Sequence, residues 1–181
     1  MSRVVIGLHG IAGSGKNTVA AMLGGFSEVY FAQPLYEAVS VITGLSVERL
    51  RDREVKEAVI PWIGRSPRQM LQTLGTDWGR GMVCDRIWVE AASQRIDRMR
   101  GDVVVTDVRF DNEAEMLKQR FGATIWKVVR PGATTCIWHP SERGVSAHLI
   151  DQTIDNGGDL AALERAVGVA LNATLKEYPP G

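Results

Sequence analysis

A glycine-rich stretch near the N-terminus constrains this chain more than any other feature. The apolar run over residues 4–8 is short enough for one buried strand, and it is followed by Gly10, four further residues, Gly15 and Lys16. A helical pattern then occupies residues 16–23. This order of strand, glycine loop and helix predicts an α/β domain in which the loop binds phosphate. The alternative is an ordinary glycine-rich turn that carries a surface lysine.

The residue types in this loop suit a polyphosphate. Glycines allow positive φ and close wrapping of backbone N–H groups around an anion, and the following helix adds its free N–H groups. Lys16 adds a mobile positive charge that can follow a transferring phosphoryl group. Asn17 stands where Ser or Thr is usual, and its carbonyl oxygen can reach magnesium directly or through water. We therefore expect the phosphates of ATP to bind at Gly10, Ala12, Gly13, Ser14, Gly15, Lys16, Asn17 and Thr18.

Composition narrows the classes of protein to which the chain can belong. Its 181 residues are 45% hydrophobic and 23% charged, which fits one globular domain over residues 1–181. Lys+Arg and Asp+Glu both total 21, so we expect neither a general nucleic-acid surface nor a membrane surface. Cys84 and Cys136 form no zinc or disulfide pattern, and we expect them to be reduced and buried. The N-terminus leads directly into a strand, so we expect no signal peptide and a cytoplasmic protein. The oligomeric state stays open, a homodimer included.

Apolar runs alternate with helical patterns along the chain. We expect strands near residues 4–8, 28–32, 103–105, 124–130 and 152–155. This alternation predicts a five-stranded parallel sheet flanked by helices. A largely helical insert, residues 34–100, separates the second and third strands, and the polar segment 131–150 is a candidate lid.

Within the helical segments, caps and periodicity predict particular boundaries. A helix starts at Pro34 with Ile42 on its apolar face, and Ser46 caps one charged helix that extends to Lys56. Another helix starts at Ser66-Pro67. The final helix, capped by Asp159, is expected to turn Leu160 inward together with Leu163, Val167 and Leu171.

In a parallel α/β sheet, ligands bind beyond the carboxyl ends of the strands. Asp107 ends a buried strand and could hold the magnesium waters, although a helix cap or a partner of Arg109 is the alternative. Arg109 has a planar fork that suits a phosphate, with a salt bridge to a nearby acid as the alternative. Arg130 and Arg143 bracket the candidate lid and could neutralise charge on the transferring group, or be ordinary loop charges. We expect Lys16, Asp107, Arg109 and Arg130 to carry catalysis.

Further polar side chains come from the insert and the candidate lid. Arg68 and Gln72 are four residues apart and share a helix face, where they could bind a phosphate and a base edge or form a solvated face. Arg80 follows in the same insert. The candidate lid residues are His139, Glu142 and Arg143, of which His139 could contact substrate or close the lid. His9 is expected to be structural, and the three histidines form no metal spacing.

Several motifs together carry a family resemblance: residues 10–18, 31–35, 71–80, 105–113 and 139–142, and 154–158 followed by Leu160. They resemble the bacteriophage deoxynucleoside monophosphate kinases, over residues 4–170, and the loop also resembles that of adenylate-kinase-type enzymes. Asn17 and Gln33 stand where the family usually has acidic residues.

The resemblance implies a P-loop NTPase fold with an acceptor-binding insert between strands two and three. It also implies transfer of the γ-phosphoryl group of ATP to a deoxynucleoside monophosphate with magnesium and, for a viral protein, work in the host cytoplasm. From their own chemistry, we expect Asn17 and Asp107 to hold this magnesium through water. The expected acceptor-binding residues are Gln33, Arg68, Gln72, Thr76, Arg80, Asp107 and Arg109. Two alternatives remain: another small-molecule P-loop kinase, such as a dephospho-coenzyme A kinase, and a non-catalytic nucleotide-binding module. A module should lack acceptor-binding arginines.

Overall fold

The computed structural model describes residues 3–133 and 144–177, and the chain divides into two compact units. The first unit comprises Met1–Tyr30 and Ala92–Gly181, and the second comprises Phe31–Ala91. The candidate lid residues His139, Glu142 and Arg143, and also Cys136, lie outside the described residues.

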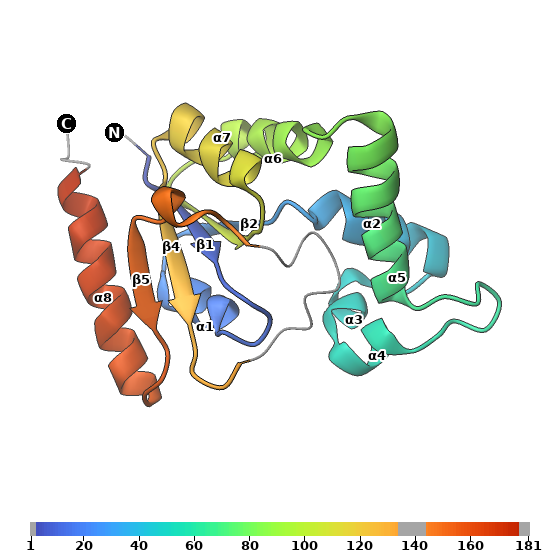
Figure 1. Cartoon of the computed structure of the whole chain (residues 1–181), viewed down its shortest axis with the longest axis horizontal. Helices are drawn as coiled ribbons and strands as arrows, with labels where there is room; N and C mark the ends of the chain where they lie inside the picture. The colour runs from blue at the N-terminus through green and yellow to red at the C-terminus, as the bar shows by residue number, and fades with distance from the viewer. Residues whose placement is uncertain (1–2, 134–143, 178–181) are drawn as a thin grey trace. The chain divides into compact units, whose positions relative to one another are not determined.

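The first unit is built on a parallel sheet of five strands. The strands are β1 (Val5–His9), β2 (Ser27–Val29), β3 (Val103–Val108), β4 (Thr124–Val129) and β5 (Gln152–Asp155), in the spatial order β2-β3-β1-β4-β5 (Figure 1). β1 and β3 are almost wholly buried, which explains their continuous apolar sequences. The predicted five-stranded parallel sheet is confirmed.

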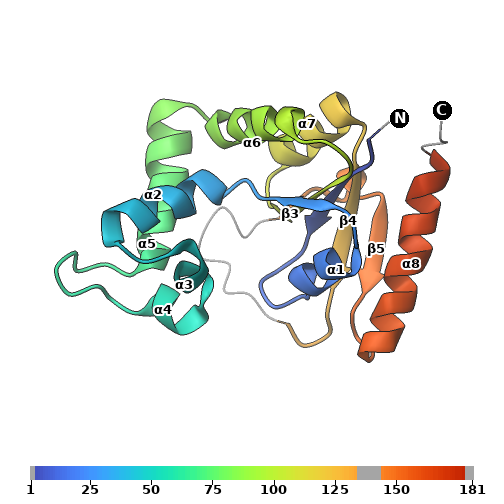
Figure 2. The same ribbon diagram turned by 180° about the vertical axis from the view of Figure 1, so that it is seen from behind.

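Helices cover both faces of this sheet. They are α1 (Lys16–Met22), α7 (Asp111–Phe121) and α8 (Leu160–Glu177), and α1 and α7 lie on opposite faces (Figures 1 and 2). Ile6, Trp126 and Val167 belong to the core between the sheet and the pair α1 and α8. Burial of each such side chain stabilises the fold by about 1.5–3 kcal/mol. These contacts fix the ends of the strands, from which the loops emerge.

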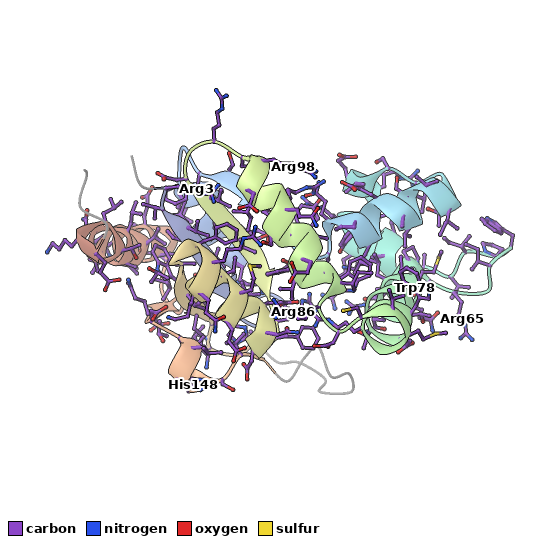
Figure 3. The ribbon with its side chains drawn as sticks, turned by 90° about the horizontal axis from the view of Figure 1, so that it is seen from above. Arg3, Arg65, Trp78, Arg86, Arg98 and His148 are labelled. Atoms are coloured by element: carbon purple, nitrogen blue, oxygen red, sulfur yellow. The ribbon has the colours of Figure 1, made fainter. Side chains whose placement is uncertain are left out.

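Arg3 connects the start of the first unit to the end of a long helix, α6 (Ile87–Arg98). Its guanidinium donates to the carbonyl oxygen of Ile96 at 2.6 Å, and Figure 3 shows it beside this helix. The guanidinium also lies over the ring of Phe121, 5.2 Å from its centroid. Helix α6 begins in the second unit and ends in the first.

The second unit consists of helices that lie between β2 and β3 in the chain, as predicted. They are α2 (Gln33–Thr43), α3 (Val47–Arg51), α4 (Arg53–Glu57), α5 (Pro67–Gln72), the π-helix η1 (Thr73–Val83) and the start of α6. Their own core contains Leu35, Val39, Leu50, Leu71 and Trp88. Across the described parts of both units, no helix is long and apolar enough to cross a bilayer.

Two predicted element boundaries were wrong. The second strand covers Ser27–Val29 and not residues 28–32, because the carbonyl oxygen of Ala32 already accepts the N–H groups that open α2. The helix predicted from Ser46 to Lys56 is divided at Asp52. The side chain of Asp52 accepts from the N–H of Val55 and so starts a second short helix.

Three burial predictions were also wrong. Ile42 is 52% exposed, because the buried face of α2 follows Leu35 and Val39. Leu160 is 65% exposed, because it is the first residue of α8 and the buried face begins at Leu163. Cys84 is exposed, since it follows the last turn of η1 in an extended conformation.

The π-helix η1 was not predicted, and two glycines and a tryptophan explain its packing. Trp88 donates from Nε1 to the carbonyl oxygen of Gly75 at 2.7 Å. A Cβ on Gly79 would lie 2.5 Å from the indole of Trp88, so only glycine allows this approach. Trp78, labelled on this helix in Figure 3, has its ring centroid 6.5 Å from that of Trp88.

Candidate functional site

A pocket of about 350 Å³ opens at the carboxyl ends of β1, β3 and β4, and we call it the strand-end pocket. It is lined by His9, Gly10, Ile11, Ala12, Lys16, Arg109, Lys127, Val128, Val129, Arg130, Ala133, Gly144 and Val145. All of these residues belong to the first unit. The pocket has the size of a small-molecule site and the position that ligands take in parallel α/β sheets.

The glycine loop that borders this pocket requires glycine at two positions. Gly10 has φ of 153° and Gly15 has φ of 102°, a region that favours glycine. A Cβ on Gly10 would lie 2.5 Å from the carbonyl oxygen of Val128, and one on Gly15 would lie 2.2 Å from Nδ2 of Asn156. The loop therefore packs its backbone directly against β4 and against the residue that follows β5.

Lys16 folds over the loop that precedes it. Its Nζ atom donates to the carbonyl oxygens of Gly10 at 2.5 Å and Ile11 at 2.9 Å. These contacts hold the ammonium group at the wall of the strand-end pocket, where an anion can be met by both the charge and the loop N–H groups.

Positive charge is concentrated in the strand-end pocket. Lys16, Arg109, Lys127 and Arg130 contribute cationic side chains to its wall, and none of the described lining residues carries a carboxylate. The whole chain has a formal net charge of zero, so this cluster is local. Four cationic side chains in one pocket wall match a ligand with several negative charges.

His9 adds a neutral ring to the same wall. Its Nδ1 atom lies 3.0 Å from the carbonyl oxygen of Val108, which can only accept, so Nδ1 is the donor. Burial lowers the pKa of His9 below 6.5, the bond to Val108 opposes this, and the charges of Lys127, Lys16 and Arg109 lower the pKa further. The imidazole is therefore neutral at neutral pH.

Arg109 is held at the end of β3 by the first turn of α7. The buried carboxylate of Glu113 accepts from the N–H groups of Arg109 at 2.7 Å and Phe110 at 3.1 Å. Asp111 in the same turn accepts from the N–H and the hydroxyl of Ser146, at 2.7 and 2.6 Å. These two bonds lower the pKa of Asp111 and hold the chain that leads from Gly144, next to His9, into η3 (Ala147–Leu149).

The structure brings together some of the residues that were predicted to bind the phosphates of ATP or to carry catalysis. Gly10, Ala12, Lys16, Arg109 and Arg130 all line the strand-end pocket. The remaining predicted loop residues, Gly13, Ser14, Gly15, Asn17 and Thr18, follow in the same loop and the first turn of α1 but do not line the pocket.

Asp107 differs from the other predicted catalytic residues in its position. It is a half-buried residue near the end of β3 and is not part of the pocket wall. Asn17 is exposed at the second residue of α1. Both carry oxygen atoms of the kind that magnesium prefers.

Five of the predicted acceptor-binding residues, Gln33, Arg68, Gln72, Thr76 and Arg80, lie in the second unit. Arg68 pairs with Glu57 at 2.5 Å, with both side chains more than 40% exposed. The side chain of Arg80 is 8% exposed, and its guanidinium donates to the carbonyl oxygen of Asp85 at 3.0 Å. Arg80 therefore also stabilises the chain that leaves η1.

Sequence reasoning missed two residues of the first unit. Lys127 lines the strand-end pocket, and it is the single charged residue in the otherwise apolar and Thr-containing strand β4. Asn156 donates to the carbonyl oxygen of Ser14 at 2.8 Å. Asn156 directly follows β5, so the rule that selected Arg109 and Arg130 at strand ends could have selected it as well.

The family model described as deoxynucleotide monophosphate kinase matches residues 53–167, more than half of the chain. The deoxynucleoside-5'-monophosphate kinase of Escherichia phage T5 is 30% identical, covering 86% of this chain and 90% of the phage protein. A putative deoxynucleotide monophosphate kinase of Acanthamoeba polyphaga mimivirus is 37% identical, covering 77% of this chain and 80% of the viral protein.

A solved structure supports the fold independently. The shikimate kinase of Acinetobacter baumannii superposes with a TM-score of 0.51 at 16% identity, covering 97% of this chain and 95% of that protein. This likeness confirms the predicted P-loop NTPase fold. The family match and both viral relatives extend over most of the same fold, and this chain belongs to the deoxynucleotide monophosphate kinase family.

Proposed function

We propose that this chain is an enzyme that transfers the γ-phosphoryl group of ATP to a deoxynucleoside monophosphate, giving ADP and the deoxynucleoside diphosphate. The observation that carries the proposal is the strand-end pocket, where four cations and a glycine loop meet without a carboxylate among the described lining residues. Such an arrangement suits a triphosphate chain. Membership of the kinase family supports the identity of the acceptor.

The donor side of the site is assigned to the loop. Lys16 and the loop backbone from Gly10 to Thr18 bind the phosphates of ATP, and Lys127 adds a further positive charge. Arg109 and Arg130 neutralise the negative charge that spreads over the transferring phosphoryl group. Phosphoryl transfer to a phosphate acceptor needs no strong general base, so positioning and charge carry most of the rate.

The acceptor side is assigned to the helical insert, residues 34–100, of a single kinase domain over residues 1–181. The proposed acceptor-binding residues are Gln33, Arg68, Gln72, Thr76 and Arg80, with Asp107 and Arg109 from the end of β3. Residues 131–150 are the proposed lid, and His139, Glu142 and Arg143 are its candidate residues. Closure over both substrates excludes water and so protects ATP from hydrolysis.

Magnesium is the expected companion of ATP in this site. Among residues 3–133 and 144–177, no group of three or more His, Cys, Asp or Glu side chains could hold a metal ion. Magnesium keeps several waters and is held largely by substrate phosphates, so it needs few ligands from the protein itself. We assign to Asn17 and Asp107 the role of holding the water molecules that coordinate the ion. When bound, the ion would add positive charge beside the phosphates of ATP.

One assay separates this function from its two rivals. ADP release is followed with ATP and magnesium against a panel of deoxy- and ribonucleoside monophosphates, dephospho-coenzyme A, and no acceptor. We expect ADP release that depends on the presence of a deoxynucleoside monophosphate. Release with dephospho-coenzyme A alone would favour the other small-molecule kinase. ATP binding without release on any acceptor would identify a nucleotide-binding module.

The partners of the enzyme are small molecules, and we propose that no nucleic acid or membrane takes part. A homodimer is tested by sedimentation of the full chain with and without substrates. The two relatives come from a phage and a mimivirus, which supports work in the cytoplasm of a host cell.

A further inference from the structure

Asn156 is the first residue after β5, and its side chain reaches the glycine loop that follows β1. Its Nδ2 atom donates to the carbonyl oxygen of Ser14 at 2.8 Å. The same nitrogen lies 2.2 Å from the place that a Cβ on Gly15 would take, so the amide packs directly on the loop backbone. The N–H of Asn156 donates to the carbonyl oxygen of Val129 at 2.7 Å, and Val129 lines the strand-end pocket. Asn156 thus joins the loop to the end of β4.

The bond to Ser14 fixes the direction of the next backbone amide. In a trans peptide the carbonyl group and the following N–H point to opposite sides of the chain. Because the Ser14 carbonyl points at Asn156, the N–H of Gly15 points away from it. Gly15 has φ of 102°, and glycine has many other accessible conformations, so the Ser14–Gly15 peptide needs an external contact to keep one orientation.

We propose that Asn156 is a positioning residue, which holds the Ser14–Gly15 peptide so that the Gly15 N–H faces the phosphate chain of ATP. This inference rests on the proposed function. Asn156 acts through the loop and does not touch the reacting atoms. The amide is suited to this task because it donates a hydrogen bond, whereas an aspartate of the same shape would turn an acceptor toward the Ser14 carbonyl.

Two variants of the full-length chain separate hydrogen bonding from space filling. Asn156→Asp keeps the shape and removes the donor, and Asn156→Ala removes both. Asp159→Ala is the matched control, because Asp159 lies in the same β5–α8 connection and its carboxylate accepts from the N–H of Ala162 at 2.7 Å. This control loses a helix cap without changing a contact to the loop.

Calorimetry with ATP and magnesium measures the affinity for ATP, and steady-state kinetics measures the KM of each substrate. Asn156→Ala should weaken ATP binding about three- to tenfold, the equivalent of one neutral hydrogen bond, and Asn156→Asp should weaken it at least as much. The KM of the acceptor should stay unchanged, and Asp159→Ala should bind ATP as the wild type does. Hydrogen exchange in residues 10–16 should become faster in both Asn156 variants only.

The opposite results overturn the inference. Wild-type ATP affinity in Asn156→Asp would show that the side chain only fills space. Equal losses for both substrates, or unchanged hydrogen exchange in the loop, would show that Asn156 does not orient this peptide. The proposed function fails separately: a wild type that binds ATP but phosphorylates no deoxynucleoside monophosphate would refute it, while the binding ratios and the exchange rates would still decide the role of Asn156.

Discussion

His9 on β1 and Lys127 on β4 are paired residues of two adjacent parallel strands, and both side chains line the strand-end pocket. The pairing places the titratable ring of His9 beside the ammonium group of Lys127. Lys16 and Arg109 add to that positive field, and the Asp111 carboxylate also interacts with the ring. The charge state of His9 is therefore sensitive to any anion that enters the pocket.

His9 should take up a proton when ATP binds. The pKa of His9 is held below 6.5, first by burial and then by the cations, so the ring is neutral before ATP binds. The negative phosphates raise this pKa, so between the lower and the raised value the complex binds one more proton, and ATP affinity rises as the pH falls through that window. Calorimetry in buffers of different ionisation enthalpy measures the number of protons that are taken up when ATP binds. In His9→Gln the number of protons taken up on ATP binding should be smaller by the amount that His9 contributes. An unchanged number would exclude His9 as the group that is protonated.

Lys127→Gln should weaken ATP binding about three- to tenfold at low salt, because it removes one exposed cation near the phosphates. Added salt should reduce the difference from the wild type, since exposed charges are screened. Lys176→Gln, an exposed lysine near the end of α8, is the matched control and should bind ATP normally. Equal losses in the two variants would indicate only a change in net charge.

Arg68→Ala should raise the KM of the acceptor about tenfold to a hundredfold and leave ATP binding nearly unchanged, because it removes one charge-assisted contact. The exposed ion pair with Glu57 contributes little to stability, so the variant should fold normally. Glu57→Gln is the control, since it removes the pair and keeps the guanidinium. An effect on ATP binding, or the same loss in both variants, would contradict a direct role of Arg68 at the acceptor.

Two glycine substitutions should change stability in opposite directions. Gly79→Ala should destabilise the chain by about 1–3 kcal/mol, because the new Cβ would lie 2.5 Å from the Trp88 ring. Gly168→Ala should stabilise it by about 0.5–1 kcal/mol, since Gly168 is inside α8 with nothing within 4 Å of the added atom. Urea unfolding midpoints measure both. A tolerated Gly79→Ala would mean that η1 can move away from Trp88.

Local patterns in the sequence were sufficient to predict much of this fold. The order of apolar run, Gly10, Gly15 and Lys16 predicted β1, the loop and α1, because each signal involves neighbouring residues. Strand ends predicted Arg109 and Arg130, since parallel strands bring their carboxyl ends to one edge. The starts of α2 and α5 were likewise predicted, from Pro34 and from the Ser66-Pro67 pair.

Features that depend on distant contacts were not predicted. The π-helix η1 packs Gly79 closely against Trp88, a contact that the local periodicity of the sequence does not indicate. The contact between Asn156 and Ser14 joins residues 142 positions apart. Lys127 was missed because it is a single charged residue within a strand, which by itself indicates no site. Its position at the pocket follows from its pairing with His9 on the neighbouring strand.

The most direct test of the account is transfer of labelled γ-phosphate from ATP to a deoxynucleoside monophosphate, by the wild type and by Lys16→Ala at equal concentration. Lys16 lies at the pocket wall against Gly10 and Ile11, where its charge can follow the moving phosphoryl group. We expect labelled deoxynucleoside diphosphate from the wild type and transfer at least about a hundredfold slower by the variant. Near-normal transfer by Lys16→Ala, or no labelled diphosphate from the wild type with any deoxynucleoside monophosphate, would contradict it.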